Sequence, residues 1–184
     1  MAHGYLLGSF LSPLTNLRSD DFGGSQAARA RFPLQVLRAV RAAWPKERPI
    51  SVRISATDWL PGGMTGAEAV VLARWLKEAG ADIISVSTGQ TMPQARPAYG
   101  RLFQTPYAEQ IRLEASVPTI AVGMISSYSD VNSIIAAGRA DLVALARAHL
   151  YDPYWTHHAA AEQDHPLPWP HPYGSVSQYK LRMK

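Results

Sequence analysis

Four short apolar runs, separated by segments with helical signals, constrain the fold of this 184-residue chain most strongly. The runs cover residues 50–55, 82–87, 119–123 and 141–146. Each run is nearly continuously apolar, as expected for strands that are covered on both faces. Because strands and helices alternate, we predict right-handed βαβ units that build a parallel sheet.

Helical patterns lie between and after these runs, over residues 25–43, 65–76, 106–115, 129–137 and 152–163. Thr65 and Glu68 have the spacing of a capping box, and Gly80 suits the end of the helix that they open. Four strand–helix units make half of a (β/α)8 barrel, which would expose two strand edges and part of an apolar interior. From the pattern alone, a small doubly wound sheet is an equal alternative.

Composition narrows the function classes. The chain has no cysteine, which excludes disulfides and thiolate chemistry and fits a reducing cytoplasm. No apolar run reaches the roughly 18–20 residues that a membrane span needs. The net charge of +4 indicates a mildly basic solvated surface, and the functional alternative is attraction to anionic ligands such as phosphates, nicotinamide cofactors or a coenzyme A thioester. Nucleic acid is not expected, because the basic residues are scattered and not interleaved with aromatic ones.

Three groups of residues are candidates for chemistry. His3 can donate a hydrogen bond to a carbonyl oxygen and Tyr5 can deliver a proton; in an extended segment the two would point to the same side. Arg53 lies inside an apolar strand, where it needs either an ion-pair partner, such as Asp58 or Asp82, or a ligand.

The third group follows the last two strands. Gly123 ends one and Ala146-Arg147 ends the other, and loops after neighbouring barrel strands often bind phosphate through backbone N–H groups. Arg101, in the segment after the second strand, is a candidate for contact with an acidic group of a substrate. The histidines show no convincing metal-ligand constellation, so we predict no metal site.

The opening segment carries a resemblance to a known family. His3-Gly4-Tyr5 is followed by Asn16, Arg18, Asp20 and Gly23-Gly24, and this run resembles the substrate-binding loop of the Old Yellow Enzyme family, FMN-dependent NAD(P)H:flavin oxidoreductases. The resemblance implies the C-terminal half of a (β/α)8 barrel over residues 1–164, comprising strands five to eight and the loop after strand four. Residues 165–184 are predicted to be an irregular tail.

The resemblance also implies roles. His3 would be one of two side chains that hold a substrate carbonyl oxygen, the other lying before Met1, and Tyr5 would be the proton donor. Arg53 would contact the flavin ring, while Gly123, Ala146 and Arg147 would bind the FMN phosphate. Alanine stands at position 146 where the family usually has glycine, so its methyl group is expected to crowd the phosphate.

A closer resemblance joins several segments, among them residues 55–59, 88–91, 99–106 and 152–156. These segments are similar to the reductase domain of bifunctional salicylyl-CoA 5-hydroxylase and 2-aminobenzoyl-CoA monooxygenase/reductase proteins. That resemblance implies a domain associated with a monooxygenase, an aryl-CoA-derived dienone as substrate, and a place in aromatic degradation.

The leading hypothesis is therefore an FMN-dependent oxidoreductase fragment that uses NAD(P)H to reduce a C=C bond conjugated to a carbonyl. We expect the chain alone to bind FMN weakly and to turn over little. One alternative is a non-catalytic half-barrel that associates with a second copy, as a homo-oligomer, or with the missing half. Another is a different phosphate-binding barrel enzyme whose opening loop matches by chance.

Overall fold

Four parallel strands form one sheet in the computed structural model, which describes residues 1–178. The strands are β1 (Ser51–Ser55), β2 (Ile83–Ser87), β3 (Thr119–Val122) and β4 (Leu142–Ala144). They pair in chain order, β1-β2-β3-β4, and every pair is parallel. A doubly wound sheet reverses its strand order, whereas a barrel adds each strand beside the last. The sheet is therefore half of a (β/α)8 barrel, as predicted.

The helices agree with the sequence pattern at most positions. The predicted helices are α2 (Gln26–Ala43), α3 (Gly66–Glu78), α4 (Thr105–Ala115), α5 (Tyr128–Ala136) and α7 (Trp155–Glu162). The capping box of Thr65 and Glu68 is formed at the start of α3. Two short helices were not predicted, namely α1 (Leu6–Leu11) and α6 (Arg147–Tyr151).

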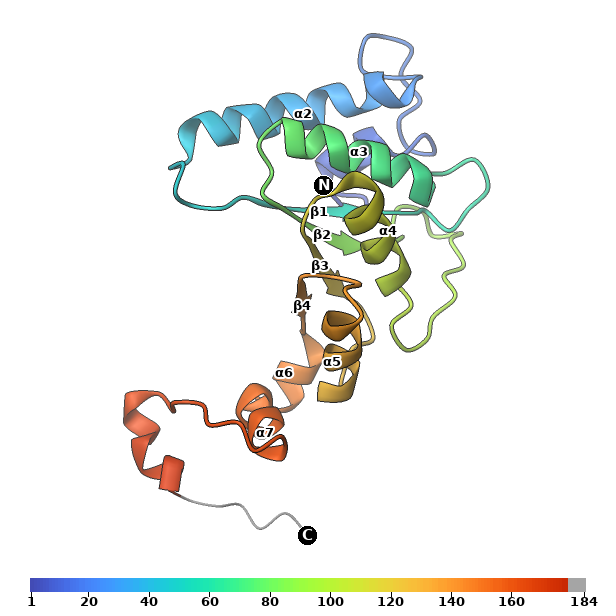
Figure 1. Ribbon diagram of the computed structural model, residues 1–184. Helices are drawn as coiled ribbons and strands as arrows, with labels where there is room; N and C mark the ends of the chain where they lie inside the picture. Colours follow the sequence, from blue (N-terminus) through green and yellow to red (C-terminus); the bar gives the residue numbers. More distant parts are fainter. Residues whose placement is uncertain (179–184) are drawn as a thin grey trace.

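The core lies between the sheet and the helices on one of its faces, α2, α3, α4 and α5 among them (Figure 1). Alternate strand residues point toward these helices, because successive side chains of a strand face opposite sides. Ile54, Ile84, Val86 and Ala121 are fully buried there and belong to one apolar cluster. This face fixes the register of the strands, since a slip by one residue would expose it.

The opposite face is only partly covered. Arg53, Ser85, Ile120 and Leu142 lie in register across the four strands and share this face. Arg53 and Leu142 are exposed. The prediction that both faces are covered is therefore wrong for this face in residues 1–178. A closed barrel turns this face toward its interior, and a half-barrel leaves it exposed.

The opening loop is anchored to the carboxyl end of β1. Asp58, only 1% exposed, accepts hydrogen bonds from the Ser12 hydroxyl and the Met64 N–H, each at 2.7 Å. The Asn16 side chain donates to the Phe10 and Phe22 carbonyls at 2.8 and 2.7 Å. These buried bonds hold the segment that carries the predicted catalytic residues against the end of the sheet.

The C-terminal segment extends away from the sheet beyond α6 and α7 (Figure 1). It is not wholly irregular, because two short 3₁₀ turns, separated by a kink at Tyr173, lie within His171–Gln178. The Trp169 ring stacks on His157, with ring centroids 4.1 Å apart. The part of the predicted tail at residues 179–184 lies outside the described residues.

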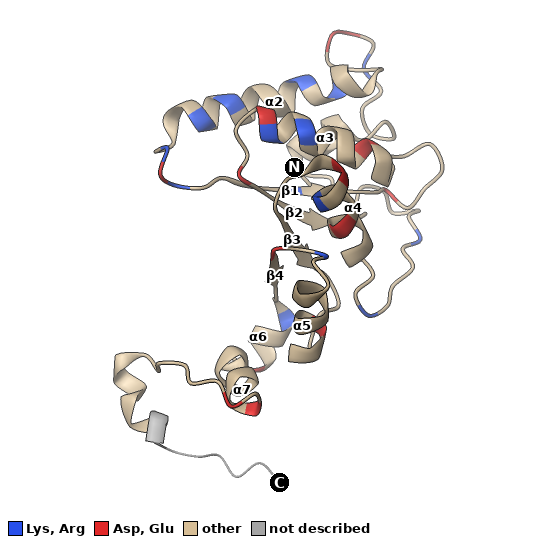
Figure 2. Cartoon of the chain, viewed as in Figure 1, with Lys and Arg blue, Asp and Glu red and all other residues tan. Residues whose placement is uncertain are grey.

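The charged residues of α2 are all arginines, and they follow one another along the helix (Figure 2). Among residues 1–178, no helix has both the length and the apolar character to cross a membrane.

Candidate functional site

A tight turn places His3 at the carboxyl ends of β1 and β2. His3 and Gly4 both adopt left-handed backbone angles, with φ of 55° and 72°. Histidine tolerates this region better than most residues, and glycine adopts it freely. A Cβ on Gly4 would come within 3.3 Å of the Gln90 carbonyl oxygen. The segment is therefore not extended, so the condition under which His3 and Tyr5 would point to the same side is not met.

Two serines at the ends of neighbouring strands hold His3. The His3 N–H donates to the Ser55 hydroxyl at 3.1 Å, and the Ser55 hydroxyl donates to the Gly89 carbonyl at 3.0 Å. The ring nitrogen Nε2 lies 2.7 Å from the Ser87 hydroxyl. Backbone and ring of His3 are thus both fixed by the sheet, because each bond reaches a strand terminus.

Tyr5 stands at the start of α1 with 77% of its surface exposed. Within residues 1–178 its hydroxyl makes no hydrogen bond. The hydroxyl is therefore available to a ligand bound on the open face.

Arg53 has no ion-pair partner among the described residues. The carboxylate of Asp58 is engaged by Ser12 and Met64, and that of Asp82 by Arg41 and the Ile50 N–H. The alternative of an ion pair within the strand is thus wrong. Burial, and then the positive charges of Arg53 and the Met1 amino group, lower the pKa of His3 below its ordinary value. The neutral form of the His3 ring is thereby favoured.

The loops after β3 and β4 meet beside each other. Gly123 has φ of +107° and Met124 φ of 53°. The backbone N–H of Met124 lacks a hydrogen-bond acceptor within residues 1–178. The exposed Arg147 guanidinium lies 3.6 Å from the Met124 sulfur. A free N–H donor and a guanidinium at the same residue suit a phosphate group.

Ala146 adopts φ of −120°, an angle open to any L-residue. Its backbone therefore does not require the glycine that the family resemblance predicts at this position.

One side chain joins the two parts of the site. Gln104, 5% exposed, accepts from the Thr88 N–H at 2.6 Å and from the Thr88 hydroxyl at 2.8 Å. Its Nε2 donates to the Val122 carbonyl at 2.7 Å. The carboxyl end of β2, which contacts His3, is thereby tied to the carboxyl end of β3, where Gly123 follows.

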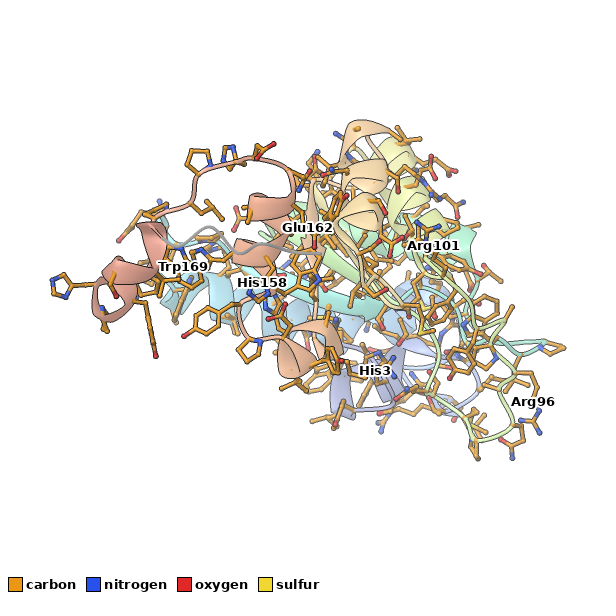
Figure 3. The ribbon with its side chains drawn as sticks, turned by 90° about the horizontal axis from the view of Figure 1, so that it is seen from below. His3, Arg96, Arg101, His158, Glu162 and Trp169 are labelled. Atoms are coloured by element: carbon orange, nitrogen blue, oxygen red, sulfur yellow. The ribbon has the colours of Figure 1, made fainter. Side chains whose placement is uncertain are left out.

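Arg101 lies apart from His3 (Figure 3). Its guanidinium forms an ion pair with Asp130, which is buried near the start of α5 and also accepts from the Ser126 and Ser127 N–H groups. The side chain of Arg101 remains 67% exposed. Its contact with substrate stays a prediction. Within residues 1–178 no cluster of three side chains could hold a metal ion.

Parallel strands present their carboxyl ends at one edge, so His3, Gly123 and Arg147 share that edge. Three strand spacings separate β1 from β4, about 14 Å in all. A single elongated ligand could therefore contact both ends of the row.

Comparison with known proteins decides the family. Residues 1–165 match the NADH:flavin oxidoreductase / NADH oxidase family. The chain belongs to this family. It is 47% identical over 161 residues to an NADPH dehydrogenase of Geobacillus sp. (strain WCH70), covering 88% of this chain and 46% of that protein. It is 43% identical over 173 residues to an NADPH dehydrogenase of Clostridium acetobutylicum, covering 94% and 50%.

A solved structure gives the same result at the level of the fold. A complex of 2-naphthoyl-CoA reductase with 2-naphthoyl-CoA superposes with a TM-score of 0.78 at 27% identity, over 89% of this chain and 25% of that one. The chain thus spans about half the length of the curated relatives that it matches. A chance match of the opening loop in some other phosphate-binding enzyme is excluded.

Membership of the NADH:flavin oxidoreductase family confirms the predicted cofactors, FMN and NAD(P)H, at the level of the family. The residues of this chain fit the phosphate end of a flavin nucleotide, because the Met124 N–H has no acceptor within residues 1–178 and the exposed Arg147 guanidinium contacts the same residue between β3 and β4.

Sequence reasoning missed Ser87 and Gln104, which both contact the predicted site. Ser87 was counted only as a strand residue and Gln104 as part of a loop wall. The signal that could have found Gln104 is Gly123: a Cβ there would lie 2.1 Å from the Gln104 Nε2, so the glycine accommodates the glutamine.

Replacing Arg53 should raise the pKa of His3. In Arg53→Met one of the positive charges that oppose protonation is lost, while burial of the ring remains, so the pKa should rise but stay below its ordinary value. Histidine side-chain NMR titration measures it. Arg38→Met removes an exposed charge of α2 and should leave His3 unchanged. An unaltered His3 pKa in Arg53→Met would contradict this electrostatic account.

Replacing Gly123 should destabilise the protein. Gly123→Ala puts a methyl group on the Gln104 side chain and forces a left-handed angle on alanine, at a cost of about 1–3 kcal/mol of unfolding free energy. Urea unfolding measures the loss. Gly100→Ala is the matched control, because no atom lies within 4 Å of its added methyl group. Equal midpoints for the two variants would show that Gly123 is not constrained.

Proposed function

We propose that the protein built on this half-barrel is an FMN-dependent oxidoreductase that uses NAD(P)H to reduce a C=C bond conjugated to a carbonyl group. The observation that supports it most is the shared edge of the sheet. A neutral ring donor, His3, stands at one end of that edge, and a phosphate-compatible loop stands at the other. Gln104 ties the two ends together.

The cofactor roles are assigned from this geometry. Gly123, Ala146 and Arg147 would hold the phosphate, through backbone N–H groups and the guanidinium. Arg53, exposed on the inner face and without a partner in residues 1–178, would place its positive charge beside the flavin ring. When bound, FMN supplies hydride transfer from the nicotinamide to the β-carbon of the alkene.

The substrate roles fall to the turn at residues 3–5. A neutral His3 can donate an N–H to the carbonyl oxygen, which stabilises the negative charge that develops there. The Tyr5 hydroxyl, exposed and free of other hydrogen bonds in the described chain, would donate its proton to the α-carbon. One hydride and one proton then complete the saturation of the double bond.

The substrate class is proposed more narrowly as a carbonyl conjugated to a ring, including an aryl-CoA-derived dienone. A structural neighbour binds 2-naphthoyl-CoA, as its name states. The net charge of +4 is compatible with an anionic thioester. In this proposal the exposed part of Arg101 contacts an acidic group of the substrate. Association with a monooxygenase domain belongs to the same proposal.

The chain alone should bind FMN weakly, in this proposal, because the flavin ring would lie on a face that the described residues leave open. Association of the half-barrel with a second copy stays a prediction, which a solution mass measurement tests.

A chimera tests the function directly. Residues 1–165 would replace the matched 161-residue segment of the Geobacillus sp. NADPH dehydrogenase. We expect the chimera to bind FMN, to oxidise NADPH and to reduce 2-cyclohexenone. Tyr5→Phe should slow alkene reduction by about 10²-fold or more, because it removes the proton donor. Reduction of the flavin by NADPH should be unchanged, and stopped-flow absorbance separates the two half-reactions.

Tyr151→Phe is the matched control, because it removes the same hydroxyl from a tyrosine that is 94% exposed on α6. Its two half-reactions should resemble those of the unmodified chimera. A Tyr5→Phe chimera that reduces the enone at the rate of the unmodified chimera would contradict the assignment of Tyr5 as the proton donor. A folded chimera that does not bind FMN would contradict the proposed cofactor.

A further inference from the structure

The orientation of the Gln104 amide is fixed by its neighbours. The Thr88 N–H, 2.6 Å from Oε1, can only donate, and the Val122 carbonyl, 2.7 Å from Nε2, can only accept. Exchanging the oxygen and nitrogen of the amide would therefore oppose two donors at one end and two acceptors at the other. Oε1 is the atom that faces the end of β2.

The Ser87 hydroxyl lies between this oxygen and His3. Ser87 Oγ is 3.2 Å from Gln104 Oε1 and 2.7 Å from His3 Nε2. The hydroxyl has one hydrogen, and Oε1 has none to offer, so a bond between the two oxygens requires the hydrogen of Ser87. Only lone pairs then remain on Oγ for the ring, and Nε2 must carry the hydrogen of that bond.

The opposite assignment is less favourable. If Ser87 gave its hydrogen to the ring, two acceptor oxygens would face each other at 3.2 Å with no hydrogen between them. Ser87 is 5% exposed and Gln104 is equally buried, so water cannot readily relieve that contact.

We propose that Gln104 is a positioning residue that sets the tautomer of His3, acting through Ser87. The neutral ring carries its hydrogen on Nε2. The inference rests on the proposed function in one respect: the Nε2 hydrogen is held by Ser87 in this structure, so a substrate carbonyl that His3 binds through Nε2 would take the place of Ser87 as its acceptor. Burial and nearby positive charge lower the pKa of His3 and favour the neutral ring, in which the position of one hydrogen decides whether Nε2 is a donor or an acceptor.

The same side chain serves the other end of the site. Its Nε2 holds the Val122 carbonyl, and its atoms occupy the space beside Gly123. The Gln104 oxygen thus accepts from the end of β2, while the Gln104 nitrogen donates to the end of β3. Substitutions at Ser87 and Gln104 can test the role of the oxygen separately.

The tautomer is measured on the chain itself, without flavin or alkene. In a sample with ¹⁵N-labelled histidine, kept above the His3 pKa, the two ring nitrogens have well-separated chemical shifts that show which one carries hydrogen. Comparison with His3→Gln identifies the His3 signals among the six histidines. We expect hydrogen on Nε2 in the native chain.

Three variants test the relay. Ser87→Ala removes the acceptor of the ring but keeps the bonds of Gln104 to Thr88 and Val122, and should give a mixture of both tautomers. Gln104→Met should give the same mixture, because the hydrogen of Ser87 becomes free to turn to the ring. Gln94→Met is the matched control, since it makes the same replacement at an exposed glutamine and should leave the His3 spectrum unchanged.

Hydrogen on Nδ1 in the native chain would overturn the proposal. So would an unchanged His3 spectrum in both Gln104→Met and Ser87→Ala. If Gln104→Met fails to fold, Ser87→Ala decides alone: a mixture of tautomers supports the proposal and an unchanged His3 spectrum overturns it. A chimera that folds but fails to reduce enones would refute the proposed function and leave the tautomer result standing, so the two failures are distinguishable.

Discussion

The carboxyl ends of four parallel strands meet at one edge, and a buried glutamine ties two of those ends together. This arrangement determines which residues can act jointly. His3 reaches the ends of β1 and β2 through serines, and the phosphate-compatible loop follows β3 and β4. Within residues 1–178 no hydrogen bond joins His3 directly to the phosphate-compatible loop, so their relative position depends on the sheet and on Gln104.

The unequal covering of the two faces of the sheet follows from the same geometry. One face is packed against helices and supplies the apolar core. The other carries Arg53 in mid-strand without an ion-pair partner in residues 1–178, which a closed core would not tolerate. A bound ligand explains the positive charge of Arg53 on this face better than a contribution of Arg53 to folding stability does. The curated relatives are about twice as long as this chain.

Much of the fold could be predicted from the sequence, because strand runs and helix caps are local signals. The capping-box spacing of Thr65 and Glu68 predicts the start of α3, and Ser25 caps α2 where the helical pattern begins. The choice between half-barrel and doubly wound sheet could not be made from pattern alone, since strand order depends on long-range pairing. Nor could the turn at His3 be predicted, because its left-handed angles are imposed by contacts with Ser55 and Gln90.

The candidate site, like the fold, could be predicted from the sequence only in part. His3, Tyr5, Arg53 and Arg147 were found from the sequence because their side chains imply chemistry. Gln104 and Ser87 were missed, since an amide and a hydroxyl are common in loops and strands, and only the fold brings them to His3. Residues that act through another residue leave little trace in a single sequence.

The central claim is that one edge of the sheet binds one ligand along its whole length. An NMR titration of the ¹⁵N-labelled chain with FMN, with riboflavin as the phosphate-free comparison, tests it most directly. The account predicts that FMN shifts the amide signal of Gly123, the Arg147 side-chain signal and the His3 ring signals together, and that riboflavin leaves Gly123 unmoved. Shifts confined to other surfaces, or identical responses to both ligands, would contradict it.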